Sequence, residues 1–73
     1  MYKRQQYTLP EASAVLVQVY NLNGQIEATL LEEVQPAGRY KLDWQPERLG
    51  SGVYFIRLQA GTEVSYQKVM YIK

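Results

Sequence analysis

The sequence lacks cysteine and histidine, the two side chains that most often carry chemistry at neutral pH. It has 73 residues and no Cys, which excludes disulfide frameworks, thiolate zinc sites and cysteine nucleophiles. It also has no His, which excludes Ser-His catalysis, imidazole metal ligands and an acid or base that titrates near pH 7. We therefore expect no enzymatic activity, no cofactor and no small-molecule substrate.

Long apolar runs and a strong net charge are missing as well. The longest apolar candidate, residues 12–17, is far shorter than the roughly 18 residues of a membrane-spanning helix. Lys3 and Arg4 are followed by polar residues, so this stretch does not resemble a secretory signal. The net charge is only +1, which argues against binding to nucleic acid or to a membrane surface. The length allows one small domain.

Tyrosine, in contrast, is abundant, with seven copies, and β-branched residues alternate with others, which favours strands. The clearest alternation places Val15, Val17 and Val19 on one face. Asn23-Gly24 follows, and this dipeptide is typical of a type I′ turn, in which both central residues need φ > 0. Residues 15–31 are therefore predicted to form a β-hairpin.

The second strand of this hairpin has an alternative. As a strand, it places Ile26, Ala28 and Leu30 on one face. A helix stays open, because Ile26, Leu30, Leu31 and Val34 also follow a helical spacing. The tight turn before the segment favours the strand.

Turn signals divide the rest of the chain into further strands. Pro36-Ala37-Gly38 reverses the chain before a strand at 39–44, which ends before Pro46 because proline cannot donate to a central ladder. Residues 45–52 are predicted to be a loop in which Leu49 covers the end of the core. Two more strands follow, at 53–60 and 63–72. With a short leading strand at 6–9, this spacing predicts an all-β fold, a small antiparallel sandwich of about six strands.

The acidic residues do not suggest a catalytic or metal site. Glu32 and Glu33 are neighbours, so in a strand they point to opposite faces and cannot form a catalytic pair. The stretch Asn21-Leu22-Asn23-Gly24 lacks the carboxylates of a calcium loop, and the turn accounts for its composition. We expect neither a catalytic dyad nor a metal ion.

The aromatic residues are better explained by packing than by ligand binding. Trp44 alternates in phase with Leu42 and Tyr40, which predicts that it faces the core. Tyr54 opens a strand after a glycine-containing corner, where sandwich folds use a tyrosine to tie the corner down. The scattered basic residues are interpreted as protection of sheet edges: Arg39, Lys41, Arg57, Lys68 and Lys73.

The run Tyr7-Thr8-Leu9-Pro10-Glu11 and the segment Ser51-Gly52-Val53-Tyr54-Phe55 resemble those of a known family, the C-terminal sorting domains of the type IX secretion system. The Ig-like domain of the flagellar hook-capping protein is similar over much the same residues, about 7–73. The matching stretches are Tyr7-Thr8-Leu9-Pro10-Glu11, Val19-Tyr20-Asn21-Leu22-Asn23-Gly24, Thr29-Leu30, Pro36-Ala37-Gly38, Trp44, Gly61, Lys68 and Lys73. The most specific stretch is Leu49-Gly50-Ser51-Gly52-Val53-Tyr54-Phe55-Ile56-Arg57-Leu58.

The resemblance implies a small Ig-like β-sandwich at the end of an exported protein, with the folded domain recognised by an outer-membrane translocon. Its partners would be that translocon and an upstream cargo domain of the same chain. The protein would pass through the periplasm to the cell surface or medium, with a signal peptide on a missing upstream part. The residues that match the terminal signal of the family are Gly52, Val53, Tyr54, Phe55, Lys68, Val69, Met70, Tyr71, Ile72 and Lys73.

The first five residues depart from the family. Members usually carry a Pro-Asn-Pro segment and another strand there, whereas Met1–Gln5 match the translation of the end of a sequencing-library transposon adapter. We therefore expect residues 1–5 to be an artefactual start, and residues 6–73 to be one sorting domain without its first strand. A sheet edge should then be exposed near residues 15–20 or Tyr7. The last strand ends close to Lys73, which we interpret as a true C-terminus.

Two other functions remain open at this stage. One is a structural Ig-like spacer or assembly module, as in the hook-capping resemblance, which would have the same fold. The other is carbohydrate binding, which predicts that Trp44 and several tyrosines are exposed and coplanar.

Overall fold

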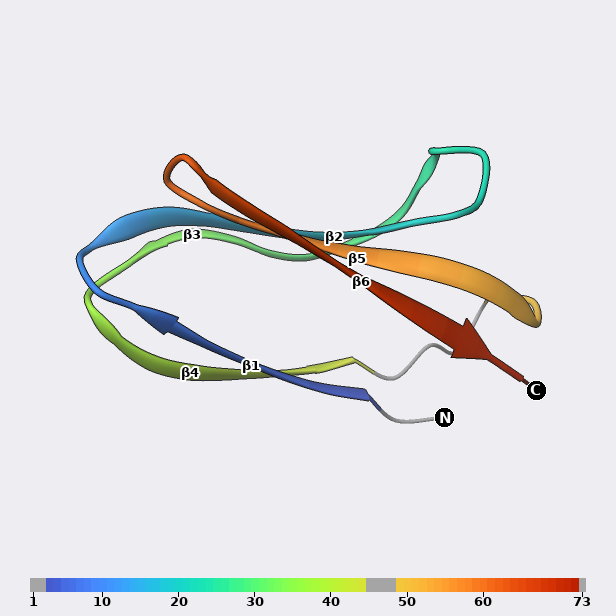
Figure 1. Cartoon of the computed structure of the whole chain (residues 1–73), viewed down its shortest axis with the longest axis horizontal. Helices are drawn as coiled ribbons and strands as arrows, with labels where there is room; N and C mark the ends of the chain where they lie inside the picture. Colours follow the sequence, from blue (N-terminus) through green and yellow to red (C-terminus); the bar gives the residue numbers. More distant parts are fainter. Residues whose placement is uncertain (1–2, 45–48, 73) are drawn as a thin grey trace.

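Six antiparallel strands in two layers make up the computed structural model, which describes residues 3–44 and 49–72. A four-stranded sheet in the order β3-β2-β5-β6 covers a two-stranded sheet of β1 and β4 (Figure 1). The predicted all-β sandwich is confirmed. The strands are β1 (Lys3–Leu9), β2 (Ser13–Tyr20), β3 (Ile26–Gln35), β4 (Gly38–Trp44), β5 (Gly52–Ala60) and β6 (Glu63–Tyr71).

The core lies between the two sheets and is centred on β2. Val15, Val17 and Val19 are each at most 2% exposed, as their alternation predicts. Trp44 is buried in the same core, and Leu49 packs against it. Removing this apolar surface from water is the main driving force for folding a chain of this size. The other buried core residues are Leu9, Tyr54, Ile56, Val69 and Tyr71.

Residues 26–35 form a strand and not a helix, but its side chains do not alternate as predicted. The pairing of β2 with β3 shifts between Val17 and Gln18 and again between Val19 and Tyr20. Each shift adds an unpaired residue, which turns the following side chains to the other face. Ile26 is therefore 55% exposed. Ala28 and Leu30 pack against the core as predicted, so the predicted common face is wrong only for Ile26.

The connection between β2 and β3 is longer than the predicted two-residue turn. Tyr20 pairs with Ile26, so residues 21–25 form the loop, and among its described residues only Gly24 has a positive φ, at 81°. The side-chain Oδ1 of Asn21 accepts hydrogen bonds from the backbone N–H groups of Asn23 and Gln25, at 2.9 and 3.0 Å. An Asn that binds the backbone two residues on is an Asx turn. The type I′ prediction is thus wrong, and Asn21 organises the loop.

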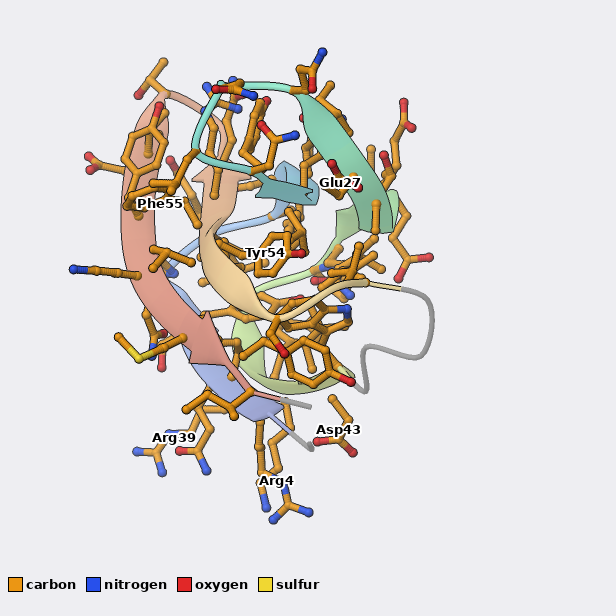
Figure 2. The ribbon with its side chains drawn as sticks, turned by 90° about the vertical axis from the view of Figure 1, so that its right-hand side faces the viewer. Arg4, Glu27, Arg39, Asp43, Tyr54 and Phe55 are labelled. Carbon is orange, nitrogen blue, oxygen red and sulfur yellow. The ribbon has the colours of Figure 1, made fainter. Side chains whose placement is uncertain are left out.

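The first strand begins at Lys3, within the segment that was expected to be artefactual, and its residues 3–5 pair with 42–44 of β4. Arg4 and Asp43 are one of these pairs, and Arg4 Nε lies 3.1 Å from Asp43 Oδ1 on the outer face of the small sheet (Figure 2). The expected exposed edge at residues 15–20 is wrong, because β2 lies between β3 and β5. The strand of Tyr7 does lie at an edge of its sheet. Pro46 falls outside the described residues.

A tyrosine pair closes the end of the core between the sheets. The Tyr7 hydroxyl donates a 2.5 Å hydrogen bond to Gln35 Oε1, and its ring stacks on Tyr40 with centroids 5.3 Å apart. Burial raises the pKa of Tyr7, while the bond to Gln35 opposes that rise.

The described strands and loops include no helix able to cross a membrane.

Candidate functional site

The two stretches that match the terminal signal of the resembled family are neighbours in the fold. They are separated in sequence, but β5 and β6 pair Gly52 with Tyr71, and the ladder continues residue by residue to Phe55 and Lys68. The register runs without a shift over the whole of both strands, all of whose residues are described. The stretches therefore form one four-pair ladder at the edge of the large sheet.

Half of this ladder points into the core. Tyr54 pairs with Val69, and both are buried, as is Tyr71. Tyr54 lies between the two sheets (Figure 2), and its hydroxyl donates a 2.7 Å hydrogen bond to the Gly50 carbonyl oxygen. The predicted corner tyrosine is confirmed. These side chains shape the ladder from inside but offer little surface to a partner.

The other half points to the outside of the sheet. Val53 pairs with Met70 and Phe55 with Lys68, and Phe55 lies on the face opposite Tyr54 (Figure 2). Met70 is 56% exposed, Lys68 is exposed, and Val53 and Phe55 are half-buried. Ile72 beyond the strand is exposed too, and Lys73 lies outside the described residues. The accessible part of the predicted signal is thus an apolar strip with one cation.

Three residues outside the predicted signal adjoin this strip. Tyr20, Arg57 and Tyr66 line a shallow depression beside Phe55. The Arg57 Nε–H donates a 3.2 Å hydrogen bond to the Tyr66 hydroxyl, and the guanidinium lies 6.0 Å from the ring centroid. Tyr66 could have been found from the sequence, because the alternation along the last strand places it on the same face as Val64, Lys68 and Met70. We call Phe55, Arg57, Tyr66, Lys68 and Met70 the outer strip.

The chemistry of the outer strip suits recognition. Its charges, Arg57 and Lys68, are both positive, and its rings and thioether supply apolar contact area. No three His, Cys, Asp or Glu residues come together in the described part of the chain. A ligand platform built on Trp44 is ruled out, because Trp44 is only 5% exposed.

Comparisons with known proteins give the family. No curated protein and no solved structure matches the chain. A family model does match, over residues 4–73, which include every strand residue except the first of β1. Its description is the secretion system C-terminal sorting domain, and the chain belongs to this family of sorting signals for type IX secretion.

Proposed function

We propose that the type IX machinery reads this sorting domain through the outer strip and the C-terminal strand β6. The family assignment implies that the domain engages that machinery as part of a cargo chain and directs export to the cell surface or medium. The finer statement is that Gly52–Phe55 and Lys68–Lys73 act together as the signal. Within it, Tyr54, Val69 and Tyr71 hold the shape and the outward residues make the contact.

The observation that supports this proposal is the direct pairing of the two stretches. A signal composed of two separated segments can be read as one surface only after the domain has folded. Exposed apolar side chains next to cations are typical of recognition surfaces, and both Met70 and Tyr66 are more than half exposed.

The route and the role of the cargo follow from the same proposal. A signal peptide on an upstream part carries the chain into the periplasm, and the folded domain is then recognised at the outer membrane. Families of sorting signals are not known as catalysts. The domain itself is not an enzyme, and any activity belongs to the cargo. The family assignment does not favour a spacer or a carbohydrate-binding module.

The N-terminal boundary is also part of the proposal. The domain proper spans residues 6–73, residues 1–5 derive from an adapter, and an upstream strand precedes the domain in the native protein. The match of Met1–Gln5 to an adapter translation supports this boundary. Sequencing the contiguous upstream DNA tests it, since a native reading frame encoding residues 1–5 would contradict it.

The test is export of a fused reporter. A periplasmic signal peptide and a reporter are placed before the 73-residue chain in a type IX-competent host, with a second version that restores native upstream sequence. We expect the reporter outside the cell. If it stays in the periplasm in both versions, the sorting role is overturned.

A matched pair of double variants then tests the outer strip. Lys68→Ala with Met70→Ala removes one exposed cation and one exposed apolar side chain from the strip, and we expect export to fall at least about tenfold, as for the loss of an interface centre. Lys41→Ala with Val34→Ala removes similar side chains from exposed positions of β4 and β3. Both proteins should keep nearly the same Tm. Equal export by the two would contradict recognition through the outer strip.

A further inference from the structure

The sheet edges of this domain differ sharply in how well they are protected against pairing with another strand. Native edge strands usually carry charges, prolines or bulges, because their free N–H and C=O groups otherwise accept a foreign strand. Among the described strands, the large sheet ends at β3 on one side and at β6 on the other. The small sheet has only β1 and β4, so each of these also has an edge.

Three of the four edge strands carry such protection. β3 has an irregular register with β2 and three exposed glutamates, Glu27, Glu32 and Glu33. β4 alternates Arg39, Lys41 and Asp43 with its core residues, and all three are exposed. β1 carries the exposed Arg4 and is followed directly by Pro10.

The fourth edge, β6, has less of this protection than the other three. It is nine residues long, contains no proline, and pairs with β5 without a register shift over its whole length. Between its two end residues the only charge in its sequence is Lys68. Val64, Tyr66 and Met70 are 42%, 66% and 56% exposed on its outer face. Such a strand is suited to accept another β-strand.

We propose that β6 pairs antiparallel with β6 of a second copy of this chain, about a two-fold axis at Gln67, and joins two four-stranded sheets into one of eight. The argument for a second copy is the self-complementary order of the side chains. Around Gln67, Val64 lies opposite Met70 of the second copy, and Tyr66 lies opposite Lys68. Apolar side chains then meet, and each ammonium group meets a tyrosine ring.

The side chains also favour the axis at Gln67 over the two adjacent registers, with axes at Tyr66 and at Lys68. Opposed residues in an antiparallel pair lie on the same face, so the axis can move only in steps of one residue. An axis at Lys68 would place two lysines directly opposite each other, which is destabilising. An axis at Tyr66 would place each Lys68 opposite Val64, without an aromatic partner. The axis at Gln67 pairs all outer-face residues favourably.

This inference goes beyond the proposed function and stands independently of it, because it concerns the backbone edge and is tested in vitro. Sedimentation equilibrium of the 73-residue chain is the first measurement. The contact is one strand wide, so we expect a weak dimer with a Kd on the order of 100 μM, which calls for loading from about 10 μM to about 1 mM. A chain that stays monomeric up to the highest concentration overturns the proposal. The free edge of β6 would then be available only to a strand of another protein.

Two variants that differ at one position test the register. In Tyr66→Glu, each glutamate faces Lys68 of the other copy and, within its own copy, Arg57. We expect the dimer to tighten by at most about 30-fold, since two pairs of opposite charge across the axis replace two contacts between an ammonium group and a tyrosine ring. Adding Lys68→Glu places glutamate opposite glutamate twice, and the dimer should weaken below detection. If both variants associate like the unmodified chain, the proposed pairing is wrong.

An isotope-filtered nuclear Overhauser experiment identifies the contact directly. Mixed labelled and unlabelled copies should show a cross-peak between the methyl groups of Val64 and Met70, which lie near opposite ends of β6 within one copy. Lys41→Glu on β4 is the control for a charge change and should leave the association unchanged. Cross-peaks that instead connect β3 or β4 of two copies would overturn the assignment to β6.

Discussion

The hydroxyl of Tyr54 donates a hydrogen bond of 2.7 Å to the carbonyl oxygen of Gly50. This bond ties the end of the loop before β5 to the strand itself, four residues on. Tyr54 is only 8% exposed, so its hydroxyl would otherwise be partly desolvated without a partner. The bond therefore fixes the start of the β5–β6 ladder.

Tyr54→Phe should destabilise the domain by about 0.5–1.5 kcal/mol, because the hydrogen bond is lost and the Gly50 carbonyl loses its partner. The ring still fills its place in the core, so the fold should be kept. Chemical denaturation measures the change. Tyr66→Phe is the control. The Tyr66 hydroxyl accepts a 3.2 Å hydrogen bond from Arg57 Nε–H on the exposed face, and the loss of this solvent-exposed bond should cost less than about 0.5 kcal/mol. Equal losses would contradict the corner role.

Val19→Ala should cost about 1.5–3 kcal/mol in the free energy of unfolding. Val19 is fully buried. Removing two of its methyl groups loses the free energy gained by burying them and leaves a cavity in the core. Val34→Ala is the same change on β3, where the side chain is 75% exposed. It should change stability by less than about 0.5 kcal/mol. Urea titrations of the two variants measure both changes in the free energy of unfolding. A similar loss at both positions would contradict the placement of Val19 in the core.

Asn21→Ala should destabilise the domain more than Asn23→Ala. The Asn21 side chain accepts two backbone N–H groups and also donates to Glu27 Oε1 at 2.8 Å, so its removal should cost about 1–2 kcal/mol. The exposed Asn23 contributes its backbone to the loop, and its truncation should cost less than about 0.5 kcal/mol. Thermal unfolding compares the two. A larger destabilisation by Asn23→Ala than by Asn21→Ala would contradict the role of Asn21 and support the type I′ turn instead.

Stability should decrease with pH above about 10, in part through Tyr7. Burial holds the pKa of Tyr7 above its ordinary value of 10.0, so the unfolded chain loses this proton at a lower pH than the folded one. The contribution is therefore complete below pH 10 and is lost as the pH rises through the folded pKa. Tyr7→Phe should show a flatter decline than the unmodified chain in denaturant titrations between about pH 9 and pH 11. Parallel declines would exclude Tyr7 as a cause.

Much of this fold could be predicted from alternation and from turn residues. Val15, Val17 and Val19 define the core strand because the period of two puts all of them on one face. Trp44 was placed inside by the same rule. Tyr54 was identified as a corner residue from the glycines before it. These predictions depend on local geometry, which sequence spacing reports directly.

The bulges between β2 and β3 could not be predicted in this way. They depend on how two strands pair, and one inserted residue reverses every later side chain. The choice of Asn21 over Asn23 depends on the same pairing, because the register decides where the loop begins. The contact of Tyr7 with Gln35 is likewise invisible in sequence, since 28 positions separate the two residues.

The sequence by itself determined the fold class, the core faces of β2 and β4 and the family, because side-chain period and local motifs carry that information. Only the tertiary structure decided that residues 52–55 and 68–71 form one ladder, with half of it buried and half exposed. It also decided that β6 is the edge strand with the least protection. The physical reason is that strand order and register come from long-range pairing, which depends on the whole core.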